Sequence, residues 1–269
     1  MIIGAVVYRL KALAGCKMPA SHGRLLHAAF LRMVQESNPE LSEMLHDTHT
    51  KSFYLGLLRF GYEPKRNTYL VHQNDVIYWR VCGVGEELLR LMTSFPSGTE
   101  LRIGEGSFAV ESLYYDQSQH SDAGITSMEY LAEGCSQLPL MRSLSLQFTT
   151  PTMFRVDDVE LPIPRTDLIF GSLAERWNYF CREYPMDVAF IKELCQFLIP
   201  INWHGETKRY NITPKRGITG FVGEFTYDIS RVDPKYRWQF ILLAEFAAFV
   251  GVGRLTAQGL GNVKISYRQ

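Results

Sequence analysis

The spacing of apolar and polar residues in the first half of the chain predicts a strand followed by a helix pair. Residues 2–13 ("IIGAVVYRLKAL") are rich in β-branched residues, which predicts a strand, and residues 21–37 change to helical spacing. The apolar stripe of this helix consists of Leu25, Leu26, Ala29, Phe30 and Met33. Because Asn38 and Pro39 interrupt the pattern, we expect the helix to end there and a short second helix to run to about His46.

The remaining predicted elements follow the same order in both halves of the chain. The rest of the first half comprises strands at 51–60, 68–72 and 75–84, a helix at 86–95, and strands at 99–104 and 107–115. The second half comprises an extended segment at 142–156, helices at 165–184 and 186–200, a strand pair at 208–229, a helix at 234–253 and a strand at 262–267. Each half therefore has the βαββαβ pattern of a ferredoxin-like domain. We predict an α+β protein with two tandem ferredoxin-like (RRM-like) domains, at residues 1–125 and 138–269, joined by a polar segment with a helix in its middle.

Composition and charge indicate a globular protein with two locally basic stretches. The chain has 269 residues, of which 46% are hydrophobic and 21% charged, so it can form a full core. Its 28 Lys and Arg balance 28 Asp and Glu, and net charge gives no argument for or against nucleic acid. Two runs are nevertheless basic: residues 1–35, with Arg9, Lys11, Lys17, Arg24, Arg32 and no acid, and residues 208–216, with Lys208, Arg209, Lys215 and Arg216. Each run forms either an anion-binding face or an ordinary solvated surface.

The five cysteines are scattered along the chain and show neither a disulfide framework nor zinc-ligand spacing. They are typical of small buried side chains in a reducing compartment. The apolar start of the chain is interrupted by Arg9 and Lys11, and no apolar run reaches membrane-spanning length. We expect a cytoplasmic protein without a membrane partner.

Two glycine pairs stand between the last predicted helix and the last predicted strand. They are Gly251 with Gly253 and Gly259 with Gly261, in the stretch "FVGVGRLTAQGLGNVKI". This helix-glycine-strand order is the reverse of a dinucleotide- or triphosphate-binding loop, and no Lys-Ser or Lys-Thr follows. A helix C-cap explains one pair but not both. We therefore expect a close approach to this backbone, and phosphates bound by N–H groups beside Arg254 would fit it.

The glycine loop resembles a signature of the RAMP superfamily. In that superfamily a loop of the form Gly-hydrophobic-Gly, five residues, Gly-hydrophobic-Gly joins the last helix and strand of tandem ferredoxin-like domains. The chain is most similar to the CRISPR-associated repeat-cleaving endoribonucleases, which process precursor crRNA. Residues 23–47 resemble their first helix and short second helix, residues 49–58 resemble their Lys-x-Phe strand, and residues 146–177 resemble their middle block.

The resemblance implies a catalytic histidine at His46 and a catalytic lysine at Lys51. Such an enzyme needs no metal and no cofactor, because the 2′-hydroxyl of RNA attacks the adjacent phosphate. Proton transfer suits histidine and charge neutralisation suits lysine, and the products are a 2′,3′-cyclic phosphate and a 5′-hydroxyl. His49 is the chief rival of His46, since a small shift in register would exchange them.

The sequence does not determine which residue, if any, is the third catalytic group. The first helix of the family commonly supplies a tyrosine, and this helix has none. His27 on the helix takes the role, Tyr54 enters from the following strand, or the enzyme works without a third group. We favour His27, although a histidine beside an apolar stripe also fits a core position. A metal site built from His46, Asp47 and His49 lacks supporting carboxylates.

The expected partner is CRISPR repeat RNA in precursor crRNA. The glycine loop and the basic hairpin residues Lys208, Arg209, Lys215 and Arg216 would grip its backbone. Tyr210, Phe221 and Trp203 either stack on bases or belong to the core. Other CRISPR effector subunits and a second copy in a homodimer are further candidate partners.

Two other functions compete with the nuclease. A non-catalytic RAMP subunit that holds crRNA in an effector complex would use the glycine loop equally well, but it would not need His46 and Lys51. An unrelated α+β protein would use the glycines only to cap a helix.

Overall fold

The structure is a computed structural model that describes residues 1–48, 50–138, 140–213 and 216–269, apart from the side chain of Asp47. The chain forms two compact units. The N-terminal unit comprises residues 2–125 together with Ala257–Gly259. The C-terminal unit comprises Met1, Thr126–Thr256 and Leu260–Gln269. Among the described residues, no helix is long and apolar enough to cross a bilayer.

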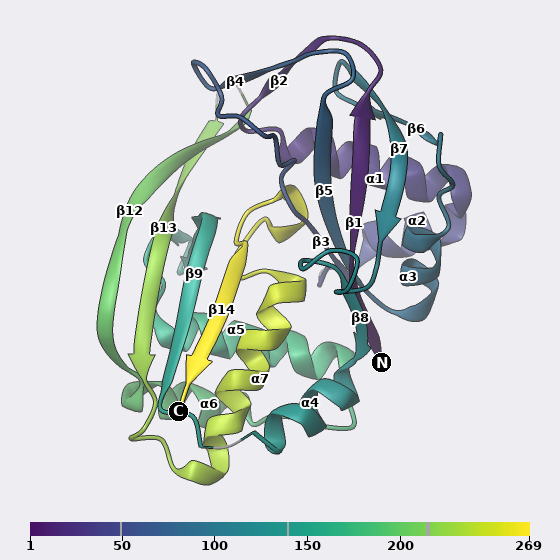
Figure 1. The fold of residues 1–269 in the computed structure, drawn as a ribbon. Helices are drawn as coiled ribbons and strands as arrows, with labels where there is room; N and C mark the ends of the chain where they lie inside the picture. Colours follow the sequence, from purple (N-terminus) through teal and green to yellow (C-terminus); the bar gives the residue numbers. More distant parts are fainter. Residues whose placement is uncertain (49, 139, 214–215) are drawn as a thin grey trace. The chain divides into compact units, whose positions relative to one another are not determined.

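The N-terminal unit is built on an antiparallel sheet in which the strands run β3-β5-β1-β7-β6, and β8 also pairs with β1 (Figure 1). Its strands are β1 (Ile2–Ala12), β2 (Cys16–Pro19), β3 (Phe53–Leu55), β4 (Thr68–Val71), β5 (Val76–Val84), β6 (Glu100–Ile103) and β7 (Gly106–Tyr114). Strand β8 (Gly124–Ser127) crosses the boundary, with Gly124 and Ile125 in this unit and Thr126 and Ser127 in the C-terminal unit. Its helices are α1 (Gly23–Ser37), α2 (Pro39–Asp47) and α3 (Glu86–Thr93). Strands β2 and β4 form a separate two-stranded sheet. The order β3-β5-β1-β7, with α1 after β1 and α3 after β5, is that of a ferredoxin-like domain.

One face of this sheet packs on the helices. Because side chains alternate along a strand, Val6, Tyr8 and Leu10 of β1 lie on the same face, and they share a buried cluster with Phe30 of α1 and Met92 of α3. That cluster explains why the helical stripe predicted from sequence is apolar. It also fixes α1 against the sheet, and α1 carries a candidate catalytic residue.

The C-terminal unit has a second antiparallel sheet, in the order β12-β13-β9-β14. Its strands are β9 (Ser143–Thr152), β10 (Phe154–Val156), β11 (Val159–Leu161), β12 (Ile199–Thr213), β13 (Arg216–Asp228) and β14 (Val263–Arg268). Its helices are α4 (Met128–Ser136), α5 (Thr166–Phe180), α6 (Val188–Leu194) and α7 (Pro234–Val250), with short 3₁₀ turns at Cys195–Phe197 and Thr256–Gln258. Strands β10 and β11 form a small hairpin. The order β12-β13-β9-β14 repeats the ferredoxin-like arrangement, with α5 and α7 as its two helices (Figure 1).

The predicted α+β class with tandem ferredoxin-like folds is confirmed, and α4 is the helix expected in the joining segment. Several boundaries differ, and strands β2, β8 and β11 were not predicted. Strand β12 begins at Ile199, where the sequence predicted a helix to 200 and a strand only from 208. Apolar Ile199, Ile201 and Trp203 alternate with Pro200, Asn202 and His204 here, but the prediction extended the preceding helix to residue 200 and did not use this alternation. The strand expected at 51–60 is limited to Phe53–Leu55.

Candidate active site

The turn between α1 and α2 is fixed by Asn38. Its side-chain oxygen accepts a hydrogen bond from the N–H of Leu41 at 3.0 Å, and Pro39 occupies the first position of α2. Its side-chain amide also donates to Glu87 of α3 at 2.8 Å. These bonds set the direction of α2 and therefore the place of its last turn, which carries His46.

Lys51 is bound to the end of α2. Its ammonium donates hydrogen bonds to the carbonyl oxygens of Leu45 at 2.8 Å and His46 at 2.9 Å. Carbonyls in the last turn of a helix lack intrahelical partners and attract a cation. The structure thus brings Lys51 to the backbone of His46, whose side chain is exposed. His49 lies outside the described residues.

His27, on α1, is the third residue predicted to be catalytic. Its imidazole is half-buried and packs on the Phe53 ring of β3, with ring centroids 5.9 Å apart. Burial lowers the pKa of His27, and the nearby charges of Lys51, His46 and Arg24 lower it further. The three residues predicted to be catalytic therefore lie within electrostatic range of one another. A histidine with a lowered pKa is neutral near neutral pH and can accept a proton.

Tyr54, the alternative third residue, lies elsewhere. Successive residues of a strand point to opposite faces, and Phe53 is the neighbour that faces His27. Tyr54 is fully buried, and burial raises the pKa of its phenol. Its hydroxyl makes no hydrogen bond within the described part of the chain. A role for Tyr54 beside His46 and Lys51 is therefore not supported.

His22 has a positioning role that the sequence did not reveal. The N–H of Leu58 donates to His22 Nε2 at 2.9 Å, so the ring proton is on Nδ1 and is donated to the carbonyl oxygen of Pro19 at 2.8 Å. His22 is also the residue immediately before α1. It therefore ties the start of the helix that carries His27 to the segment after β3. No local motif announces this bond, because Leu58 is distant in sequence.

The four glycines of the loop have left-handed backbone conformations, with φ values of 70°, 77°, 84° and 72° at Gly251, Gly253, Gly259 and Gly261. Gly251 ends α7 as expected. A Cβ on Gly253 would lie 2.3 Å from the carbonyl oxygen of Met153, and one on Gly261 would lie 2.0 Å from that of Val252. The close approach predicted from sequence is thus made by the protein's own backbone.

Many N–H groups of the loop already have partners inside the protein. The backbone N–H groups that donate to oxygen atoms of the protein are those of Gly251, Val252, Arg254, Leu260, Gly261 and Asn262. The Arg254 side chain pairs with Glu160 at 3.1 Å. The expectation that these glycine N–H groups are free for phosphates is therefore wrong at Gly251 and Gly261. Of the four glycines, Gly253 and Gly259 are those for whose N–H groups the described bonds give no acceptor, and Thr256 and Ala257 between them are buried.

The predicted basic hairpin is formed by β12 and β13, although Lys215 lies outside the described residues. Lys208 pairs with Glu206 at 3.2 Å, and the Arg209 side chain lies across Gly217, where a Cβ would be 2.7 Å from Arg209 Nε. Arg216 is exposed at the start of β13.

Of the three aromatic residues proposed for base stacking, two belong to the core. Tyr210 and Phe221 are buried, whereas Trp203 is 63% exposed. The Trp203 ring stacks on Phe225, with centroids 5.8 Å apart and planes 11° from parallel. Trp203 is thus the member of this set that offers a surface to a base.

Comparison with known proteins identifies the family of the chain. The model described as "CRISPR Cas6 N-terminal domain" matches residues 5–96, and that described as "CRISPR-associated endoribonuclease Cas6" matches residues 146–263. The chain belongs to the Cas6 family. The first Cas6 match contains all three candidate catalytic residues, and the second contains the glycine loop.

Relatives of known sequence and structure agree with this membership. A CRISPR-associated endoribonuclease Cas6 of Streptococcus thermophilus is 25% identical over 126 residues, which cover 46% of this chain and 51% of that protein, so the match spans about half of the relative. A solved Cas6 product complex is 25% identical, covers 99% of this chain and 100% of its own, and has a TM-score of 0.77. Thermus thermophilus Cas6 shares the fold at 24% identity, with coverage of 98% of both chains and a TM-score of 0.72.

Proposed function

We propose that this protein is a metal-independent endoribonuclease that binds and cuts CRISPR repeat RNA in precursor transcripts to release crRNA. The observation that supports the proposal is the bond of Lys51 to the carbonyl oxygen of His46 at the end of α2, with His27 of α1 within electrostatic range of both. Membership of the Cas6 family supports the substrate class. The S. thermophilus relative is described as an endoribonuclease, and a solved relative is described as a product complex.

The chemistry follows from the protonation states of these groups. Neutral His27 accepts the proton of the 2′-hydroxyl as it attacks the adjacent phosphorus. The bond to the 5′-oxygen breaks, and His46 acts as the general acid that donates a proton to that oxygen. Lys51 uses two N–H donors on the α2 carbonyls, which leaves one N–H for the charge that develops on the phosphate. The products are a 2′,3′-cyclic phosphate and a 5′-hydroxyl.

The test is cleavage of the repeat RNA of the protein's own CRISPR array in excess EDTA. We expect His46→Ala to lower the single-turnover rate by at least about 100-fold, because it removes a proton-transfer group, and to leave RNA affinity nearly unchanged. A 2′-deoxy nucleotide at the scissile position should block cutting completely. His72→Ala is the matched control, since His72 is an exposed histidine of the same unit.

Cleavage that requires added metal, or that survives the 2′-deoxy substitution, would contradict the mechanism. If His49→Ala abolished cutting while His46→Ala did not, the role of His46 would pass to His49.

We further propose that the RNA backbone contacts Lys208, Arg209, Lys215 and Arg216 together with the glycine loop, and that the protein acts in the cytoplasm. The exposed face of Trp203 supports base stacking beside this hairpin. Association with other CRISPR effector subunits, or with a second copy, is tested by the mass of the complex in solution with and without repeat RNA.

A non-catalytic RNA-holding RAMP subunit is the second candidate. It is favoured by the bonds of Lys51 to the α2 carbonyls, because capping a helix is by itself a sufficient reason for a lysine at this position. Multiple turnover of repeat RNA distinguishes the nuclease, whereas the subunit would bind RNA stoichiometrically and leave it intact.

A further inference from the structure

A basic stripe runs along the solvent side of α1, beginning at the active site. Arg24, Ala28 and Arg32 recur at intervals of four residues, which places them on one side of the helix, and all three are exposed. Arg24 lies close enough to His27 to lower its pKa. These arginines belong to the acid-free basic stretch at residues 1–35, to which the proposed reaction assigns no role.

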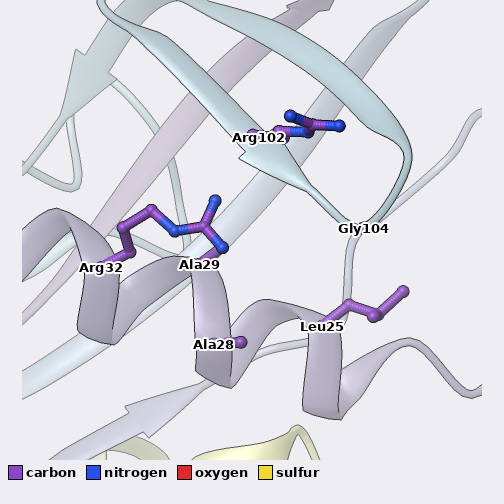
Figure 2. A pocket seen from close by; sticks show the side chains of 6 residues that line it. All are labelled: Leu25, Ala28, Ala29, Arg32, Arg102 and Gly104. Atoms are coloured by element: carbon purple, nitrogen blue, oxygen red, sulfur yellow. The ribbon is translucent and has the colours of Figure 1, made fainter.

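The stripe leads to a pocket between α1 and the turn that joins β6 and β7. The pocket has a volume of about 450 Å³ and is lined by Leu25, Ala28, Ala29, Arg32, Arg102 and Gly104. Figure 2 shows the Arg32 side chain extending from α1 on the side where Arg102 of β6 lies, with Ala28 and Leu25 further along the same helix. Gly104 has a φ of 60°, and a Cβ there would lie 2.9 Å from Leu25 Cδ1, so the turn rests closely on the helix.

The two arginines supply positive charge without a described counter-ion. Within the described ranges, neither Arg32 nor Arg102 forms an ion pair, whereas Arg9 pairs with Glu111 and Arg90 pairs with Glu86. A guanidinium presents planar N–H donors that match the oxygens of a phosphate, and two of them at one pocket match it better than one.

Acidic residues limit the basic surface on one side. A neighbouring pocket shares Arg32 and Arg102 but is also lined by Glu36 and Glu100. The positive charge on this side of α1 therefore runs from Arg24 to Arg32 and is followed by the carboxylates of Glu36 and Glu100. The axial rise from His27 to Arg32 is about 7.5 Å, which is short enough for a few nucleotides to span.

We propose that the Arg32–Arg102 pocket binds a backbone phosphate of the substrate RNA a few nucleotides from the scissile bond. The inference rests on the proposed function, because it assumes that RNA occupies the site at His27, His46 and Lys51. The pocket contributes affinity and register and takes no part in bond breaking.

The test compares Arg32→Gln/Arg102→Gln with wild-type protein in binding and single-turnover cleavage of repeat RNA over a series of salt concentrations. We expect affinity to fall about tenfold, and the slope of log affinity against log salt to become shallower by about 0.7 for each phosphate that the protein no longer neutralises. The rate at saturating protein should stay within about twofold of wild type. Arg90→Gln, at an exposed and ion-paired arginine of α3, should change neither quantity.

RNA shortened one nucleotide at a time from each end locates the phosphate. The difference between wild type and the double variant should vanish once the RNA no longer reaches the pocket. The inference would be overturned if the double variant bound RNA with the affinity and salt slope of wild type. It would also be overturned if the double variant lost no more affinity than Arg90→Gln does. If wild-type protein binds repeat RNA without cutting it, the proposed function fails, while the binding measurements still decide the role of the pocket.

Discussion

His22 is enclosed at the start of α1, where it joins the helix of His27 to the segment that follows β3. Its side chain is 1% exposed, and both ring nitrogens are hydrogen-bonded. Burial lowers the pKa of His22 from 6.5 to about 4, so the ring is neutral in the folded protein at neutral pH.

This burial makes the stability of the fold depend on pH. Between pH 6.5 and about 4 the unfolded state binds a proton at His22 that the folded state does not, so the free energy of unfolding falls as pH falls through this window. The decrease due to His22 is about 3 kcal/mol. Urea unfolding of wild type and His22→Gln at pH 4 to 8 measures it. The two proteins should lose stability by different amounts below pH 6.5, and parallel curves would contradict the assignment.

The lowered pKa of His27 predicts the shape of the pH–rate profile. A general base works in its neutral form, so the cleavage rate should fall as pH falls through a midpoint below 6.5. Because the Lys51 charge helps to lower this pKa, Lys51→Met should slow cleavage and also move the midpoint upward. Single-turnover rates between pH 5 and 8 provide the measurement, with His72→Ala as the control that keeps the wild-type midpoint. A midpoint well above 6.5 in wild type would exclude His27 as the base.

At the scale of elements, the glycine loop is a backbone structure in its own right. Gly253 and Gly261 approach the carbonyl oxygens of Met153 and Val252 so closely that a Cβ has no room. The loop is therefore held to the end of β9, and its shape is set before any ligand arrives.

Gly261→Ala should lower the free energy of unfolding by at least about 2 kcal/mol, since it adds both a left-handed alanine and a clash with the Val252 carbonyl. Gly134→Ala is the matched control, because Gly134 lies within α4 and a Cβ there meets nothing within 4 Å. That control should be neutral or slightly stabilising, as alanine favours helix. If Gly261→Ala and Gly134→Ala had equal urea midpoints, the loop backbone would be able to move enough to accommodate a Cβ at residue 261.

The sequence correctly predicted a close approach at the glycine loop. The predicted approaching group, a phosphate, differed from the backbone carbonyls that the structure shows there. Four glycines in a short span predict a close approach, but not that the approaching groups are the carbonyl oxygens of Val252 within the loop and of Met153, which follows β9, the strand that pairs with β14. His22 was missed for the same reason, since its partner Leu58 is brought to it by the tertiary fold. The start of β12 was missed although Ile199, Ile201 and Trp203 alternate there, because this alternating face is solvent-exposed and the preceding helix was predicted to run to residue 200.

At the scale of the molecule, repeated order of elements was enough to predict two ferredoxin-like folds. The β-branched run of β1, the apolar alternation in β9 and the stripe on α1 carry that information locally. The meeting of His27, His46 and Lys51 could be expected only through resemblance to a family, because the turn at Asn38 and the bonds from Lys51 to α2 have no distinctive sequence period.

Ala257–Gly259 belong to the N-terminal unit although the whole of Thr126–Thr256 precedes them in the chain. Ala257 is part of the buried cluster beneath α1, and a Cβ on Gly259 would lie 2.4 Å from Leu57 Cδ2. During translation the half that carries His27, His46 and Lys51 consequently leaves the ribosome without a piece of its own interior. The nascent chain completes that half only after residues 257–259 have been made, so a product truncated before them lacks part of this interior even when His27, His46 and Lys51 are all present.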